Sequence, residues 1–217
     1  MPTLLLRLAA PLQSWGSSSK FEIRTTEKMP TKSGVLGMLA AALGMRRDAD
    51  LSNPEIPLNR LKFGVRADRE GEEITDFHMA QGEKSYVTYR HYLSDAIFLV
   101  GLEGNESFLR ELEIALQNPR FPLFLGRRSC PPTLPIVIGM RDLSLKDALC
   151  REAPLYDNHE TMLRIQVETD CPDAGMIQDV PLSFNPKRRR YGYRRIEEFF
   201  EEFNSKETEH DAMLELR

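Results

Sequence analysis

The sequence predicts an α+β fold in which two helices pack on an antiparallel sheet. Segments with apolar residues at every second position, typical of strands, are separated by two segments whose apolar residues have helical spacing. In addition, 41% of the 217 residues are hydrophobic and 29% are charged, which suits the core of one domain. We therefore expect a single domain over residues 1–203 and an acidic tail over 204–217.

The first two elements are expected close to the N-terminus. Residues 3–9 are mostly Leu and Ala and form the first strand. The Ala- and Leu-rich run 34–43 follows Ser33 and is closed by Gly44, which are common residues at the start and end of a helix. Its small residues indicate a helix that packs closely on the sheet.

Three strands and a second helix are expected next. Apolar and polar residues alternate over 61–67, and 73–78 is the expected partner of that strand. Residues 96–100 form a short apolar strand, and 106–117 place their apolar side chains on one helix face. The order strand, helix, strand, strand, helix is that of a ferredoxin-like fold.

The last third of the chain is expected to add a loop, a strand and one more helix. Residues 119–135 are rich in Pro and Gly and form the loop, and the alternation over 163–167 predicts the strand. A helix over 196–203 is predicted by the i, i+3, i+4, i+7 spacing of Ile196, Phe199, Phe200 and Phe203.

The formal net charge of −4 hides an uneven distribution. Residues 197–217 hold eight acidic and two basic side chains, so residues 1–196 have a net charge of +2. Basic residues cluster at Arg46-Arg47, at Arg127-Arg128 and in the segment 186–195. A nearly neutral body with basic clusters can bind a polyanion on one face, although any one doublet is more often solvated surface.

Several classes of protein are not expected. The longest nearly uncharged stretch, 34–45, has 12 residues, which is too short to cross a bilayer, and the N-terminus lacks the features of a signal peptide. Three widely spaced cysteines indicate neither a disulfide framework nor a zinc ribbon, and the four histidines lack metal-ligand spacing. We expect a cytoplasmic protein without a metal or cofactor.

Two segments have the chemistry of phosphate sites. Residues 31–33 (Thr-Lys-Ser) precede the first helix, where unpaired amides and the positive dipole end attract anions; a plain helix cap is an equal alternative. In the segment 124–132, a glycine permits close approach of the backbone to a ligand. Arg127 and Arg128, in the same segment, offer bidentate contacts to phosphate.

Aromatic and basic side chains alternate in a third candidate segment, 86–92. RNA bases can stack on such rings while the cations contact phosphates, but an exposed β-ribbon has the same composition. Trp15 is a further stacking candidate, although a single tryptophan is more often part of the core. His78, Lys84 and Tyr89 supply the groups needed for metal-independent RNA cleavage, but their spacing has no specificity.

Five motifs occur in order along the chain: Leu6–Gly16, Pro30–Gly37, Tyr89–Ala96, Leu125–Pro131 and Asp179–Pro186. Together they resemble the CasD family, the 5′-handle-binding subunit of type I-E CRISPR Cascade, over almost the whole chain. The resemblance implies a RAMP protein with a ferredoxin-like (RRM-like) core and a protruding thumb hairpin. The thumb is expected at about 79–90, several residues shorter than is usual.

The resemblance also implies a function and a set of partners. The subunit would be non-catalytic, cap the 5′ handle of the CRISPR RNA (crRNA) and help assemble the complex for antiviral defence. Its partners would be the handle, the adjacent backbone subunit and the large subunit, with target DNA nearby, no membrane contact and no homo-oligomer. The corresponding type I-C protein is the crRNA-processing endoribonuclease, so cleavage by His78, Lys84 and Tyr89 is the alternative function.

The resemblance and the side-chain chemistry together assign the site residues. The expected RNA-binding residues are Gln13 and Trp15; Thr31, Lys32 and Ser33; Tyr89 and Arg90; and Arg127, Arg128 and Ser129. Trp15 or Tyr89 would stack a splayed base, and the basic and hydroxyl groups would hold phosphates. Contacts to target DNA or the large subunit are expected from Lys187, Arg188, Arg189 and Arg190.

Overall fold

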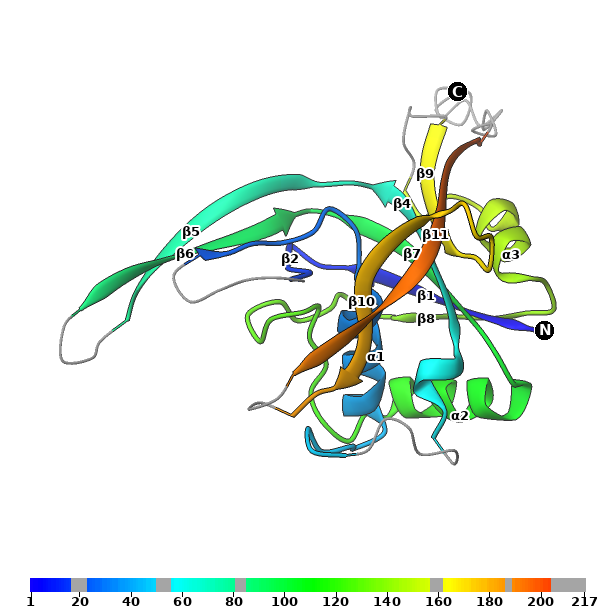
Figure 1. Cartoon of the computed structure of the whole chain (residues 1–217), viewed down its shortest axis with the longest axis horizontal. Coiled ribbons are helices and arrows are strands. Elements are labelled where there is room, and N and C mark those ends of the chain that lie inside the picture. The colour runs from blue at the N-terminus through cyan, green and yellow to red at the C-terminus, as the bar shows by residue number, and fades with distance from the viewer. Residues whose placement is uncertain (17–22, 50–55, 81–84, 157–161, 186–188, 204–217) are drawn as a thin grey trace, which may run out of the picture.

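A seven-stranded antiparallel sheet forms the centre of the molecule (Figure 1). The computed structural model describes residues 1–16, 23–49, 56–80, 85–156, 162–185 and 189–203. The strands lie in the order β10-β11-β9-β4-β7-β1-β8. Their bounds are β1 Thr3–Ala9, β4 Lys62–Arg69, β7 Ile97–Glu103, β8 Val137–Arg141, β9 Met162–Glu168, β10 Gly175–Ser183 and β11 Arg190–Glu202.

Four of these strands and two helices form a ferredoxin-like core, which confirms the predicted fold class. The chain passes through β1, α1 (Lys32–Ala42), β4, β7, α2 (Glu106–Gln117) and β8, and the strands pair in the order β4-β7-β1-β8. The elements predicted over 3–9, 34–43, 61–67, 96–100 and 106–117 agree with β1, α1, β4, β7 and α2 to within a few residues.

Each face of the sheet has its own apolar core. On one face, the buried side chains of α1 and α2 pack with Leu4, Leu6 and Leu8 of β1. The opposite face is covered by α3 (Leu145–Arg151), whose Leu149 packs with residues of β1, β7 and β9. The sequence does not predict α3, because seven residues are too few to establish a helical period.

The prediction of a C-terminal helix over 196–203 is wrong. Residues Ile196–Glu202 belong to β11, which pairs with β9 there and with β10 nearer its start. A spacing of four places two residues on the same side of a strand as well as of a helix. Phe199 and Phe203 therefore share one side and pack on the core beneath α3, whereas Phe200 on the other side is 57% exposed.

A long hairpin extends from the sheet between β4 and β7 (Figure 1). Its strands are β5 (Glu72–Ala80) and β6 (Tyr86–Ser94), so it is considerably longer than the thumb expected at 79–90. The predicted strand 73–78 exists within β5, but it pairs with β6 rather than with β4. Two short strands, β2 (Leu12–Gln13) and β3 (Ile23–Arg24), also pair with β6 and complete a second sheet.

The helices in the described part of the chain are short. α1 has 11 residues, α2 has 12, and a 3₁₀ turn covers Leu58–Arg60. Within the described ranges, no helix combines the length and the apolar character that a membrane crossing requires.

Candidate nucleic-acid interface

The Gly-rich loop after α2 is fixed against the N-terminal segment of the chain. Gly126 has a φ of +88°, and a Cβ there would lie 1.7 Å from the Ser14 carbonyl oxygen, so glycine is required. The Ser14 N–H donates to the Leu125 carbonyl at 3.2 Å, and the Cys130 N–H donates to the Arg127 carbonyl at 2.9 Å. The glycine therefore approaches the protein's own backbone rather than a ligand, and it fixes the turn that carries Arg127.

Arg127 is held at the base of the hairpin by two contacts. Its guanidinium lies over the Tyr92 ring, 4.7 Å from the centroid, and its Nη2 donates to the Arg24 carbonyl at 2.7 Å. The Tyr92 hydroxyl lies 3.4 Å from Ser129 Oγ, and strand pairing places Arg24 beside Arg90. We call Arg24, Arg90, Tyr92, Arg127 and Ser129 the arginine cluster.

The arginine cluster has hydrogen-bonding capacity to spare. Arg90 Nε and Arg127 Nη1 are buried without a hydrogen-bond partner among the described residues. Because buried polar groups are nearly always paired, such donors can be completed by an ordered water or by a bound polar group. Burial by itself raises the pKa of Tyr92, but hydrogen bonds with Ser129 and Arg127 and the Arg127 charge outweigh it and lower that pKa. The cluster therefore favours negative charge.

Four of the predicted RNA-binding residues come together in this region. Arg90, Arg127 and Ser129 belong to the arginine cluster, and Arg128 is the exposed neighbour of Arg127 on the same turn. Arg90 and Arg127 are almost 40 residues apart in sequence. They lie in one region because the turn at Gly126 folds back against strand β6. Their contact with RNA stays a prediction.

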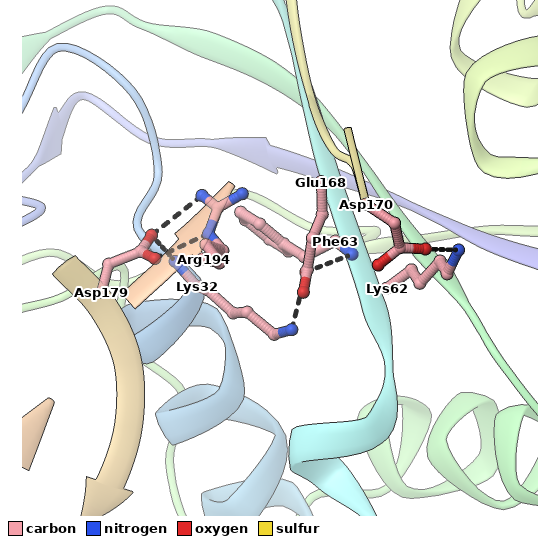
Figure 2. Close-up of polar contacts among 7 residues, drawn as sticks. All are labelled: Lys32, Lys62, Phe63, Glu168, Asp170, Asp179 and Arg194. Atoms are coloured by element: carbon pink, nitrogen blue, oxygen red, sulfur yellow. Dashed lines mark hydrogen bonds and ion pairs between the residues drawn. The ribbon is translucent and has the colours of Figure 1, made fainter. Parts of the chain in front are cut away.

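The N-terminus of α1 is occupied by the protein's own carboxylates (Figure 2). The Lys32 N–H donates to Asp179 Oδ2 at 2.8 Å, and Lys32 Nζ lies 2.7 Å from Glu168 Oε2. Burial lowers the pKa of Lys32, although Glu168 acts in the opposite direction. Thr31 caps the helix through its side chain, and Ser33 is buried beside it. Residues 31–33 therefore form a helix cap rather than a phosphate site. The Lys32 N–H and the Lys32 ammonium are already bound to carboxylates and are not open to phosphate.

This network extends over strands β9, β10 and β11 and contacts Phe63 of β4. Arg194 of β11 donates to both Asp179 oxygens, from Nε at 2.6 Å and from Nη2 at 2.9 Å, and lies over the Phe63 ring. Glu168 also accepts the Phe63 N–H at 3.2 Å (Figure 2). We call Lys32, Glu168, Asp179 and Arg194 the buried ion network; it joins α1 to strands β9, β10 and β11.

Gln13 and Trp15 are core residues. The Gln13 amide donates to the Ala96 carbonyl at 2.7 Å and accepts from Trp15 Nε1 at 3.1 Å. Trp15 is 1% exposed and lies so close to Gly34 that a Cβ there would be 2.8 Å from the ring. The expectation that these side chains contact RNA is wrong for this structure, because neither has a surface on which a base can stack.

The proposed catalytic residues are not brought together in the part of the chain that the structure describes. Strand pairing places His78 opposite Thr88, so His78 and Tyr89 lie on opposite faces of the hairpin. His78 Nε2 is 2.7 Å from Asp76 Oδ2, and Tyr89 is 49% exposed on the face away from Arg90. Lys84 lies outside the described residues.

The basic C-terminal segment is described only in part. Arg189 and Arg190 are exposed at the start of β11, whereas Lys187, Arg188 and the acidic tail 204–217 lie outside the described residues. Among the residues that are described, no group of three or more His, Cys, Asp or Glu side chains is arranged to hold a metal ion.

Sequence reasoning missed five residues of these two regions, and one of them is Glu168, which lies 136 residues along the chain from its partner Lys32. Arg90 and Tyr92 are two apart in a strand and therefore share a face, so Tyr92 was detectable from the alternation in 86–92. Arg24 has no local signal, because its position depends on the parallel pairing of β3 with β6. Asp179 and Arg194 also lack a local sequence signal, because they meet only through the pairing of β10 with β11.

The family of the chain follows from its sequence match. Residues 3–197 match the family described as CRISPR-associated protein (Cas_Cas5). Because this match includes nearly all of the chain, the protein belongs to the CRISPR-associated Cas5 family. Within this class it is similar to the CRISPR system Cascade subunit CasD of Escherichia coli (strain K12). The two are 36% identical over 157 residues, which are 63% of this chain and 70% of that protein.

Two solved structures resemble the chain over most of its length. One, described as the crystal structure of a Cas protein, is 40% identical with a TM-score of 0.75 and covers 92% of this chain and 95% of its own. The other, described as a CRISPR RNA-guided surveillance complex, is 34% identical with a TM-score of 0.79 and covers 93% and 90% respectively. The similarity to CasD confirms the family resemblance inferred from the five motifs.

Proposed function

We propose that this protein is the crRNA-binding subunit of a type I-E Cascade surveillance complex and that it caps the 5′ handle of the crRNA. The observation that carries the proposal is the arginine cluster, in which Arg90 Nε and Arg127 Nη1 lack partners among the described residues. Guanidinium groups with unused donors, next to the exposed Arg128, match the phosphates of a single strand.

The relatives support this assignment. The similar E. coli protein is a Cascade subunit, and one similar structure belongs to an RNA-guided surveillance complex. Ferredoxin-like cores occur in proteins with many functions, so the fold alone adds little evidence for RNA binding. The combination of family membership with a cluster of unsatisfied arginine donors supports RNA binding specifically.

The protein acts as a binding subunit rather than as a nuclease. General acid–base cleavage needs two groups that face the same scissile phosphate, and His78 and Tyr89 lie on opposite faces of the hairpin. His78 Nε2 also lies 2.7 Å from Asp76 Oδ2. This arrangement disfavours the alternative of a type I-C-like endoribonuclease.

The remaining surfaces accommodate the other expected partners. The hairpin β5–β6 would contact an adjacent backbone subunit, and Arg189 and Arg190, which are exposed, would contact the large subunit or nearby target DNA. Assembly then takes place around the RNA in the cytoplasm, without a membrane contact and without self-association of this chain.

The test uses the purified full-length chain with its labelled cognate repeat RNA in the absence of metal. On a native gel we expect retention of RNA that is competed by the isolated 5′ handle, and on a denaturing gel we expect intact RNA. A discrete product at the base of the repeat hairpin, lost in His78→Ala, would instead make this a processing nuclease. Absence of any handle-specific retention would contradict the capping function.

A further inference from the structure

The first half of β11 carries a row of aromatic and basic side chains on one face. Tyr191, Tyr193 and Arg195 occupy every second position of the strand, so they project from the same side of it. Tyr193 is 61% exposed, Arg195 is also exposed, and Tyr191 is half-buried. We call these three residues the tyrosine ladder. None of the functions assigned above uses these side chains.

The tyrosine ladder faces away from α1. Strands β10 and β11 lie across that helix (Figure 1). Arg194 turns toward the helix, because it donates to Asp179, which also accepts the Lys32 N–H. The ladder residues alternate with Arg194 and therefore occupy the opposite face. On that face α3 reaches β11 at Glu197, which Lys146 Nζ contacts at 2.9 Å, and the ladder lies beyond this contact, toward the start of the strand.

The charge around the ladder is positive. Arg195 forms no ion pair with any residue that the structure describes, and the same is true of Arg189 and Arg190, which are exposed at the start of the strand. Arg194, in contrast, is buried and paired with Asp179. Three exposed guanidinium groups without a counter-charge from the described residues attract a polyanion.

Exposed rings flanked by cations match an unpaired nucleic-acid strand. Bases stack on tyrosine rings when their own faces are free, whereas the bases of a duplex are already stacked on one another. Tyr191 and Tyr193 are two strand residues apart, a distance of about 6.8 Å, so each ring can take a base of its own. Arg189 and Arg195, which flank the two rings in sequence, can then contact phosphates.

The other half of β11 shows what distinguishes the ladder. Phe200 is also an exposed aromatic residue, but its neighbours on its own face of the strand are Glu198 and Glu202. Arg164, opposite Phe200 on β9, is paired with Glu70 and Glu198. This part of the strand therefore offers an exposed ring without a free cation, and only the ladder combines the two along β11.

We propose that the tyrosine ladder binds a single strand of DNA. This inference rests on the proposed function, in which the arginine cluster takes the crRNA handle and target DNA lies near Arg189 and Arg190, and it adds a site for an unpaired DNA strand. Neither stacking on a ring nor a contact to phosphate requires a ribose 2′-hydroxyl, so DNA fits the ladder. The site tolerates any base sequence, because every base has a face that can stack.

The test measures the fluorescence anisotropy of a labelled oligothymidine of about 12 nucleotides with the full-length protein. Unlabelled 5′-handle RNA is present in saturating excess, so that the arginine cluster is occupied. Tyr191→Ala/Tyr193→Ala should weaken binding of the oligothymidine by about tenfold or more, because two stacking surfaces are lost. Phe200→Ala removes an exposed ring from the opposite face of the same strand; it is the matched control and should bind as the wild type does.

Two further variants separate stacking from charge. Tyr191→Phe/Tyr193→Phe keeps both rings and should keep the wild-type affinity. Arg195→Ala should reduce the slope of log affinity against log salt concentration by about 0.7, because one phosphate contact to a single strand is lost. Arg195→Ala also replaces the double alanine variant if that protein does not fold. Each variant should bind the labelled handle as tightly as the wild type.

The outcomes separate this inference from the proposed function. If the handle is bound but the double alanine variant binds oligothymidine as tightly as Phe200→Ala does, the ladder is not a DNA site and the capping function stands. If oligouridine of the same length binds more tightly through the same tyrosines, the strand is RNA and the inference is wrong. If loss of the rings weakens binding of a protein subunit and leaves DNA affinity unchanged, the ladder is a protein surface and the inference is also wrong.

Failure of the proposed function has its own signature. If the wild type does not bind the handle, the capping function fails. Oligothymidine binding that still depends on the two tyrosines would then support the ladder site by itself.

Discussion

The arginine cluster and the buried ion network contain the same kinds of side chain, but they differ in how completely those side chains are paired. In the buried ion network, Asp179 accepts hydrogen bonds from three donor atoms. The Lys32 side chain is 2% exposed and forms an ion pair with Glu168. In the arginine cluster, the Arg127 guanidinium contacts a ring and carbonyl oxygens, and no carboxylate among the described residues forms an ion pair with it. A cation neutralised by its own protein stabilises the fold, whereas one left without a counter-charge is available to a polyanion.

The largest expected effect comes from breaking the buried ion network. Asp179→Ala leaves Arg194 buried without its partner and should lower the free energy of unfolding by about 3–5 kcal/mol. Urea unfolding followed by circular dichroism measures this change. The matched control is Asp170→Ala, which removes the exposed pair with Lys62 in Figure 2 and should cost less than about 1 kcal/mol. Equal losses in the two variants would show that the network is not structural.

Lys32→Met sharpens the contrast between stability and binding. Glu168 loses the ammonium but keeps the Phe63 N–H, so we expect a loss of about 1.5–3 kcal/mol in unfolding free energy. The dependence of RNA affinity on salt should not change, because this cation contacts no phosphate. A flatter salt dependence in Lys32→Met would place Lys32 in the RNA site after all.

Gly126→Ala tests whether the turn, and not only its side chains, positions the arginine cluster. The new Cβ would overlap the Ser14 carbonyl at a positive φ, a strain of about 1–3 kcal/mol that the loop must relieve by moving. We expect weaker binding of the handle with a smaller loss of stability than in Asp179→Ala. Gly139→Ala, at a glycine where a Cβ meets only an arginine side chain at 3.4 Å, is a less crowded comparison. Unchanged handle affinity in Gly126→Ala would mean that the turn does not set the site.

The smallest effect is a shift in the ionisation of Tyr92. Ser129 and Arg127 together hold the pKa of Tyr92 below its ordinary value against the opposing effect of burial. Arg127→Ala removes a hydrogen bond and a positive charge, so the Tyr92 pKa should rise. Absorbance titration of tyrosinate measures the shift, and the Tyr92→Phe variant identifies the signal of Tyr92. An unchanged Tyr92 pKa in Arg127→Ala would show that Arg127 does not influence the ionisation of Tyr92.

The sequence predicted the parts of the fold that depend on local periodicity. The strand over 3–9 and the helix over 106–117 are confirmed because their apolar patterns meet the core directly. The helix over 196–203 failed because a spacing of four suits a strand equally well, and pairing with β9 decides between them. The predicted pairing of strand 73–78 with strand 61–67 is wrong, because the apolar periodicity of a strand does not determine which strand it pairs with.

The candidate site was predictable only in part, for a related reason. Composition identified Arg127 and Arg128 as cations on a Gly-rich turn, but it could not distinguish them from Lys32, which has a similar setting in sequence. The distinction lies in partners far along the chain: Asp179 and Glu168 approach α1 only through the C-terminal strands. Burial of Trp15 likewise depends on the close approach of Gly34.

The most direct test of the account measures handle affinity against salt concentration for three proteins. For the double variant Arg127→Ala/Arg128→Ala, we expect weaker binding and a salt slope reduced by about 1.4, because two phosphate contacts to a single strand are lost. The exposed doublet variant Arg46→Ala/Arg47→Ala, which removes the same charge elsewhere, should retain the wild-type slope. If both double variants change the slope equally, or if neither does, the arginine cluster does not hold the handle and the central claim is contradicted.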